Sequence, residues 1–169
     1  CRNGVCVCAG SDGTMTTSVD IYLDTAGSLA NDTRFDWSSA VNGASTTTCS
    51  HHRDVVFNCG FYNDTDATGS GPRYVCSVGF NATRGSSFPK NPGRLPNAIM
   101  TGGWYTFKHT FKGVGGVLVI DMEILPFGSS TPAASWTIYA SSAGDQIISP
   151  EGPVVPVGPV DFVSGPNKN

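Results

Sequence analysis

The chain is poor in charge and has no long apolar stretch. Only 14% of its residues are Asp, Glu, Lys or Arg, and the formal net charge is −3. This balance gives no basic patch of the kind that binds nucleic acid or an anionic membrane surface. No apolar run approaches the roughly 18 residues that a membrane-spanning helix needs. We therefore expect neither nucleic acid nor a membrane among the partners of this protein.

Catalytic motifs are also missing from the sequence. It contains no Ser-His-Asp order, no nucleophile elbow and no HExxH pattern. Asp121 and Glu123 share a strand face and have the residue types of a glycosidase carboxylate pair. A solvated outer face accounts for them better, because no other acid of clear placement accompanies them. His51 and His52 are adjacent, so on an extended chain they point to opposite faces and are poorly placed to share a metal. An enzyme is the least supported class, and we expect none.

The strongest positive signal is the alternation of residues 103–125, which predicts two strands joined by a tight turn. The turn falls at residues 113–116, where glycine tolerates the positive φ that hairpins require. On the first strand Trp104 faces one way, and His109 lies in line with three aromatic residues on the other face. A histidine so placed is more often a hydrogen-bonded core residue than a catalyst. The return strand has a wholly aliphatic face, which we expect in the core: Leu118, Ile120, Met122 and Ile124.

Short alternating segments recur along the chain, and helical periodicity does not. We expect residues 25–50 to be mostly loop, with a short edge strand at 34–37. The other expected strands are 1–9, 17–24, 53–62, 73–80, 104–111, 117–125 and 135–140. About eight short strands in 169 residues predict one all-β domain, an antiparallel β-sandwich of jelly-roll type.

Six cysteines lie in the first half of the chain, at 1, 6, 8, 49, 59 and 76. An even number suggests a disulfide framework, although six cysteines allow 15 pairings. Cys59 and Cys76 each share a face with aromatic residues, so both thiols should point into one core and bond each other. Cys6 and Cys8 alternate onto one strand face and are poorly placed to pair, which leaves Cys49 or another chain as their partner. Cys1 completes the set. Zinc would need a CxxC pair or a matched histidine spacing, and neither is present.

Three N-glycosylation sequons, at Asn31, Asn63 and Asn81, lie in turn-like contexts. Together with the cysteines they indicate an extracellular protein, secreted or at a cell surface. The chain starts at Cys1 rather than Met, so we expect a processed or incomplete product from which any signal segment has gone.

From residue 150 onward the composition changes, which divides the chain into a sandwich domain (1–149, with a cysteine-rich start) and an extended C-terminal arm (150–169). Pro153, Pro156 and Pro159 recur with the period of a polyproline II helix. Extended, 18 residues reach about 60 Å. The arm should dock on its own domain or on a neighbour's, because its apolar side chains are otherwise uncovered. Its anchors would be Val154, Val155, Val157, Val160, Phe162 and Val163.

Residues 53–139 resemble a module of secreted bacterial proteins, mostly of unassigned function. The resemblance is carried by RDVVFNCGFYNDT (53–65), GPRY (71–74), FPKNPGR (88–94), GWYTFKHTF (103–111) and GGVLVID (115–121). It implies extracellular display and no known activity. Cysteines replace apolar residues of the module at 59 and 76, and the arm stands where the module has a final Gly-rich aromatic strand. A sandwich that lacks its last strand has an open edge, which invites a strand from elsewhere.

Two binding sites are conceivable on the surface. The loop that contains Asp64 and Asp66 has oxygen ligands in alternate positions, as a structural calcium site would, but a plain Asx-rich turn explains it better. We therefore expect no cofactor. Outward Trp104, with Tyr22 and Trp37, would form a sugar-stacking platform.

The sequence thus favours an extracellular structural subunit that assembles head to tail into a fibre or surface layer, its arm docked on the next copy of the chain. The alternative is a monomeric, secreted carbohydrate-binding module whose tail folds back onto its own edge.

Overall fold

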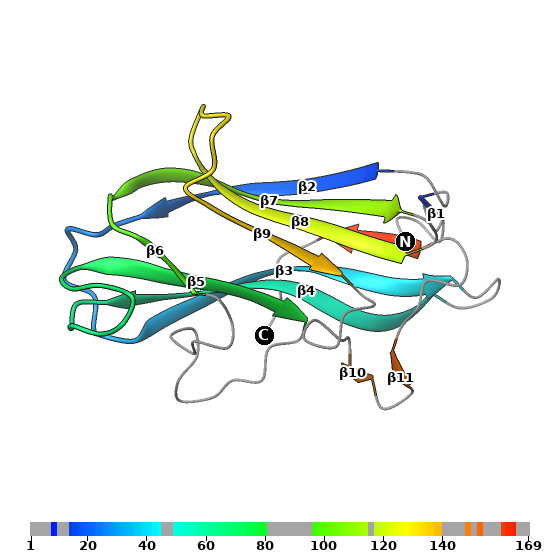
Figure 1. Ribbon diagram of the computed structural model, residues 1–169, viewed down its shortest axis with the longest axis horizontal. Coiled ribbons are helices and arrows are strands. Elements are labelled where there is room, and N and C mark those ends of the chain that lie inside the picture. The colour runs from blue at the N-terminus through cyan, green and yellow to red at the C-terminus, as the bar shows by residue number, and fades with distance from the viewer. Residues whose placement is uncertain are drawn as a thin grey trace.

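The hairpin expected at residues 103–125 is the centre of a four-stranded antiparallel sheet in the computed structural model (Figure 1). The structure describes residues 8–9, 14–44, 49–80, 96–114, 117–139, 148–149, 152–153 and 160–164. Side chains are described for residues 14–39, 55–79, 96–112 and 119–138. Everything described is strand, turn or irregular, and the described residues include no helix long and apolar enough to cross a membrane.

Two antiparallel sheets lie face to face, which makes the domain a β-sandwich (Figure 1). The first sheet has the order β2 (Thr14–Leu23), β7 (Gly103–Val114), β8 (Val117–Pro126) and β9 (Ala134–Tyr139). The second has the order β1 (Cys8–Ala9), β12 (Val160–Ser164), β3 (Thr33–Ala44), β4 (Cys49–Tyr62), β5 (Arg73–Phe80) and β6 (Asn97–Ile99). A separate small pair is formed by β10 (Ile148–Ser149) and β11 (Gly152–Pro153). Strands β3 to β6 and β7 to β9 form meanders of consecutive strands, whereas β2 pairs with β7 and β12 pairs with β1 and β3 across long stretches of sequence. Jelly-roll connectivity stays a prediction.

The core lies between the sheets and is built from the alternating faces of their strands. Ile120, Met122 and Ile124 are fully buried, which confirms these three residues of the expected aliphatic face of β8, and the side chain of Leu118 lies outside the described set. Aromatic rings from both sheets fill the centre. The ring centroids of Phe57 on β4 and Phe107 on β7 lie 5.3 Å apart, edge to face. Such contacts between aromatic rings add about 0.5–1.5 kcal/mol to the stability gained from burial alone.

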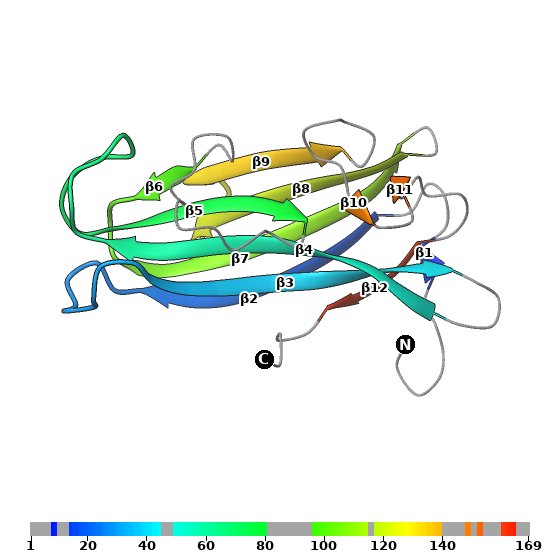
Figure 2. The ribbon, with the colours of Figure 1, turned by 90° about the horizontal axis from the view of Figure 1, so that it is seen from below.

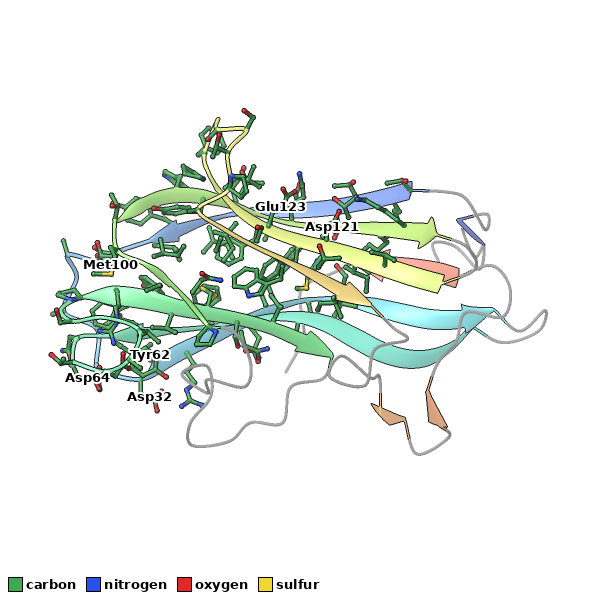
Figure 3. The ribbon with its side chains drawn as sticks, viewed as in Figure 1. Asp32, Tyr62, Asp64, Met100, Asp121 and Glu123 are labelled. Carbon is green, nitrogen blue, oxygen red and sulfur yellow. A yellow bond between two sulfur atoms is a disulfide. The ribbon has the colours of Figure 1, made fainter. Side chains whose placement is uncertain are left out.

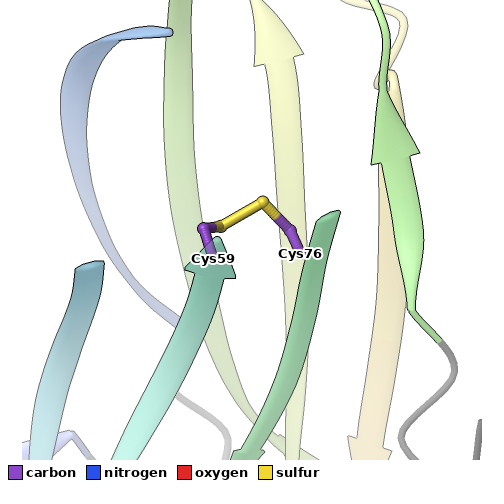
Figure 4. The surroundings of a disulfide bond; sticks show 2 residues. All are labelled: Cys59 and Cys76. Carbon is purple, nitrogen blue, oxygen red and sulfur yellow. A yellow bond between two sulfur atoms is a disulfide. The ribbon is translucent and has the colours of Figure 1, made fainter. Parts of the chain in front are cut away.

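The disulfide expected between Cys59 and Cys76 is confirmed (Figure 4). The two residues are directly opposite on β4 and β5, with their Cα atoms 4.1 Å apart, and both are buried in the core. In the chain-entropy account, a bond across 17 residues stabilises the fold by about 3 kcal/mol. Cys1 and Cys6 lie outside the described residues, and so do the side chains of Cys8 and Cys49.

The outer faces of the two sheets differ. On β4 and β5 the face turned away from the core is buried as well: Val75 and Ser77 are fully buried, and Asn58, opposite Ser77, is 2% exposed. On the four-stranded sheet the corresponding face carries exposed or half-buried aromatic, hydroxyl and charged side chains, although Val119 and Leu125 on this face are buried. The broad solvent-facing surface of the described sandwich is therefore that of β2, β7, β8 and β9.

The expectation of a loop over most of residues 25–50 is wrong. Strand β3 runs from Thr33 to Ala44 and pairs with β4 along its whole length. Its second half is rich in Ser, Ala and Gly, which have little intrinsic preference for strands. Pairing with the apolar β4 on one edge and with β12 on the other accounts for the strand (Figure 2).

The end of the C-terminal arm forms β12, which pairs with β3 of the same chain from Val160 opposite Gly43 to Ser164 opposite Ser39. Only the backbone is described here, so the side chains of Val160, Phe162 and Val163 lie outside the described set. The remaining expected anchors lie outside the described residues altogether: Val154, Val155 and Val157.

Candidate binding surface at the loop end of the sandwich

One end of the sandwich gathers the exposed apolar side chains. This loop end consists of residues 24–32, 63–72, 100–102 and 127–133, with the strand termini beside them. The strands end together there, since Leu23 pairs with Gly103 and Phe61 pairs with both Thr33 and Tyr74. Every described large hydrophobic residue that is exposed lies at this end: Tyr22, Leu29, Met100, Trp104 and Phe127. Exposed apolar groups collected in one place are typical of interaction sites.

Tyr22 and Trp104 are directly opposite on β2 and β7, on the outer face of the four-stranded sheet. Alternation puts them there, because Ile21 and Tyr105 beside them face the core. The tyrosine is 54% and the tryptophan 55% exposed. Their ring centroids are 5.5 Å apart at an interplanar angle of 65°, an edge-to-face pair. The sequence predicted both as outward residues, and the structure confirms it.

Phe127 extends this pair by one position. Its backbone N–H donates to the carbonyl oxygen of Trp104 at 2.9 Å, so it follows the β7–β8 ladder directly. The turn closes with a bond from Ser129 N–H to Pro126 O, and Gly128 takes a φ of +78° that favours glycine. The phenylalanine is 65% exposed, the highest value among the large hydrophobic residues described. We call Tyr22, Trp104 and Phe127 the aromatic row.

Hydrogen-bonding groups lie beside the aromatic row. Two residues along, at the next position on the same face, Asp20 is opposite Thr106, whose hydroxyl donates to Asp20 Oδ1 at 2.6 Å. Both groups remain accessible enough to meet a ligand, since Asp20 is exposed and Thr106 half-buried. A surface with apolar ring faces and adjacent oxygen acceptors can hold a ligand that is itself part apolar and part hydroxylated.

Asp121 and Glu123 lie on the same outer face, as expected (Figure 3). Glu123 pairs with Lys108 at 2.5 Å, and Asp121 pairs with Lys112 and accepts a hydrogen bond from Thr137. Burial alone would raise the pKa of Asp121, but the hydrogen bonds from Lys112 and Thr137 and the charge of Lys112 hold it below its ordinary value. A general acid in glycoside hydrolysis needs a raised pKa instead.

The loop of residues 63–72 is organised around Arg73, which is fully buried. Its guanidinium donates to Asp66 Oδ1 at 2.6 Å, to Thr68 Oγ1 at 3.1 Å and to the carbonyl oxygen of Asp64 at 2.7 Å. Asp66 Oδ1 also accepts from the N–H and hydroxyl of Thr68. The described part of the chain contains no group of three or more acidic, His or Cys side chains arranged to hold a metal. The absence of a cofactor stays a prediction, and calcium at Asp64 and Asp66 stays the less favoured alternative.

The residue 24–32 loop is tied to β4 by Asp32, which has a φ of +69°. Asp32 Oδ1 accepts hydrogen bonds from Tyr62 and Arg34, both at 2.6 Å. Burial and the hydrogen bond to Asp32 raise the pKa of Tyr62, which therefore stays a neutral donor. Figure 3 shows Asp32, Tyr62 and Asp64 together at this end.

Two of the sequons meet at the loop end as well. Asn31 and Asn63 are both exposed, and Asn31 Oδ1 accepts from the backbone N–H of Asn63 at 2.9 Å. The sequon at Asn81 lies outside the described residues. A sugar on either described asparagine would start at the surface.

Trp37 does not belong to a surface platform, so that expectation is wrong. Its side chain packs against the core, and its ring is stacked on those of His109 and Phe57, with centroid distances of 4.4 and 5.8 Å. Phe35 and Trp37 share the inward face of β3, and the loop expected after residue 37 hid that alternation. Trp37 is therefore not among the exposed aromatic residues, whereas Phe127 is. The sequence analysis did not identify Phe127 as an exposed aromatic residue. An apolar residue followed by glycine at the end of an alternating strand was the available signal.

Comparisons with protein-family models, with curated proteins and with solved structures find no match to this chain. The resemblance of residues 53–139 to the bacterial secreted module stays a prediction.

Proposed function

We propose that this chain is an extracellular, non-catalytic module that binds carbohydrate through the exposed rings of Tyr22 and Trp104. The observation that carries the proposal is their placement directly opposite each other on the outer face of the four-stranded sheet, with Asp20 and Thr106 at the next position on the same face. Sugar rings have apolar C–H faces and hydroxylated edges, so aromatic faces beside oxygen acceptors complement both parts.

Charge supports a sugar over a nucleic acid as the ligand of these rings. Bases also stack on Tyr and Trp, but nucleic-acid sites combine stacking with a positively charged groove. Here the two lysines on the described outer face, Lys108 and Lys112, are paired with Glu123 and Asp121. The whole chain has a net charge of −3.

The extracellular assignment is supported by the Cys59–Cys76 disulfide, because such bonds persist in oxidising compartments. The exposed sequon residues Asn31 and Asn63 are compatible with a glycoprotein.

Replacing Trp104 with alanine is expected to weaken glycan binding at least about tenfold, which corresponds to about 1.4 kcal/mol. The fold should tolerate the change, since the side chain is half exposed. A screen of soluble oligosaccharides and insoluble polysaccharides would identify the ligand, and calorimetric titration would then compare the variants.

Met100→Ala is the matched control. Met100 is 52% exposed at the same end of the sandwich but lies outside the aromatic row. Equal losses in both variants would indicate general apolar adhesion, and the absence of any glycan that binds the wild-type protein would refute the proposal.

A second candidate is the fibre or surface-layer subunit, in which β12 would pair with β3 of the next copy instead of with β3 of its own chain. A terminal strand that pairs with β3 of its own chain can pair with β3 of a neighbouring copy, because the backbone hydrogen bonds are the same in both cases. The connection from β9 to β12 spans residues 140–159 and includes the β10–β11 pair. A fully extended chain of this length would reach another molecule.

Paired cysteines would distinguish these two arrangements. Ala40 and Val163 are directly opposite, so Ala40→Cys with Val163→Cys would trap the pairing when every native cysteine except Cys59 and Cys76 is serine. Exchange between copies is expected to give a ladder of covalent oligomers on non-reducing gels and large particles of native protein by light scattering. A monomer band with particles of one domain's mass would exclude the assembling subunit.

A further inference from the structure

The third ring of the aromatic row suggests what kind of glycan this surface takes. We infer that Tyr22, Trp104 and Phe127 form one continuous site for a single, neutral, linear oligosaccharide that lies across the strands and is long enough to reach Phe127. This inference depends on the proposed carbohydrate function and goes beyond it in naming the ligand's charge, form and length.

Continuity follows from the backbone. Tyr22 and Trp104 are opposite in the β2–β7 ladder, and the Phe127 N–H bond to Trp104 O places Phe127 at the next position beyond β7. The three residues thus occupy successive positions perpendicular to the strands, about 4.8 Å apart. A ligand that runs along the row meets one ring after another, so its affinity should grow with its length.

The angle between the first two rings decides the form of the ligand. Two rings that stack on the flat face of a crystalline polysaccharide must be close to coplanar. The rings of Tyr22 and Trp104 are inclined by 65°, so they cannot both lie flat against one plane. They can both contact a separate chain, one by its face and the other by its edge.

Charge decides the class of sugar. The acidic group beside the row is Asp20, held by the Thr106 hydroxyl. The nearest lysine on this face is Lys108, in the register position opposite Ser18, and it is already paired with Glu123. A uronic acid or a sulfated sugar would approach the Asp20 carboxylate without an available cation on the described face. A neutral sugar can instead donate its hydroxyls to Asp20 and to the Thr106 hydroxyl oxygen, whose own proton is already donated to Asp20.

The row is also held in place before a ligand arrives. The backbone of Trp104 pairs with Tyr22 on one side and accepts a hydrogen bond from Phe127 N–H on the other. The hydroxyl of the adjacent Tyr105 donates to Thr101 O at 2.7 Å. Gly102 packs where a Cβ atom would come within 2.9 Å of Thr25 Oγ1. The backbone that carries Trp104 therefore needs little ordering at binding, which reduces the entropic cost of forming the complex.

Calorimetric titration with unbranched neutral oligosaccharides of increasing length, from disaccharide to hexasaccharide, tests the inference. Wild-type affinity is expected to rise with length until the chain reaches Phe127. Phe127→Ala should remove about a tenfold gain from the longer ligands and leave the disaccharide unchanged, whereas Phe127→Tyr should retain the gain. Trp104→Ala should weaken binding at every length.

The outcomes separate the two proposals. If Trp104→Ala abolishes binding but Phe127→Ala affects all lengths equally or none, the proposed function stands and the continuous site is wrong. Preferential binding of polygalacturonate, or binding to crystalline cellulose alone, would likewise overturn the neutral single-chain ligand. Failure of every neutral, acidic and insoluble glycan to bind refutes the proposed function together with this inference. Thermal melting of each variant verifies that it is folded.

Discussion

Acidification below pH 6.5 is expected to destabilise the wild-type protein much more than a His109→Phe variant. His109 is fully buried, and burial lowers its pKa from 6.5 to about 3. The unfolded chain takes up a proton on this histidine below pH 6.5 and the folded chain does not. The free energy of unfolding therefore falls by about 1.4 kcal/mol for each pH unit below 6.5, and by about 5 kcal/mol at pH 3. Above pH 6.5 the histidine is neutral in both states and contributes no pH dependence.

The surroundings of His109 explain why it stays neutral. Its Nδ1 is 3.0 Å from the Ser39 hydroxyl on the opposite sheet and 3.4 Å from the Thr17 hydroxyl on β2. Its other described neighbours are the rings of Trp37, Phe57 and Phe111. None of these groups carries a charge between pH 3 and pH 7, so nothing beside the ring compensates for a buried imidazolium.

Phenylalanine is the matched replacement because it keeps a flat ring in the stack. The Ser39 and Thr17 hydroxyls remain 2.9 Å apart and can bond each other without the imidazole. Urea denaturation at several pH values between 4 and 7 would measure both proteins. The surface carboxylates titrate alike in the two, so equal pH slopes would show that His109 is protonated in the folded state and would contradict the prediction.

The sequence predicted those features that period-two alternation controls. It placed Trp104 outward and His109 inward from the same strand, and it paired Cys59 with Cys76 because both lay among inward aromatic residues. The structure confirms each of these. Alternation carries this information because a one-residue shift would turn the whole apolar face of a strand to solvent.

Alternation failed where the side chains are small or the strand ends. Ser38, Ser39 and Ala40 lie in β3 through their pairing with β4, a tertiary effect that local propensity does not record. Because that strand was missed, Trp37 was placed at the surface. Alternation did not identify Phe127, because this residue follows the last paired residue of β8 and lies in a turn. The positive φ of Gly128 and the hydrogen bond from Phe127 N–H to Trp104 O define that turn.

Arg73 was hidden from sequence reasoning for a different reason. Arginine is mostly a surface residue, and Arg73 begins a strand after a polar loop, where exposure is the ordinary expectation. Its full burial becomes understandable only with the loop in place. Two backbone carbonyls, one hydroxyl and the Asp66 carboxylate all turn toward its guanidinium. The buried guanidinium thus supplies the hydrogen-bond donors that the oxygen atoms of the loop require.

Replacing Arg73 with methionine is accordingly expected to lower the free energy of unfolding by about 3–5 kcal/mol, because breaking a buried pair leaves its partners desolvated and uncompensated. Methionine keeps most of the side-chain volume, so the loss reports the guanidinium rather than a cavity. The carbonyl groups of Asp64 and Gly71, at 2.7 and 3.0 Å, would lose this donor. Urea denaturation measures the change, and hydrogen exchange at Thr68 and Gly69 would show whether the loop opens first.

Arg73→Lys is the control that separates charge from geometry. Lysine keeps the positive charge but has no planar fork with which to reach Asp66, Thr68 and the two carbonyls together. An intermediate loss is therefore expected, larger than a single neutral hydrogen bond and smaller than that of methionine. If methionine cost less than about 1 kcal/mol, the guanidinium would contribute no more than a surface ion pair does, and the loop would have to be held by the Asp66–Gly69 backbone bonds and the Thr68 bonds to Asp66 alone.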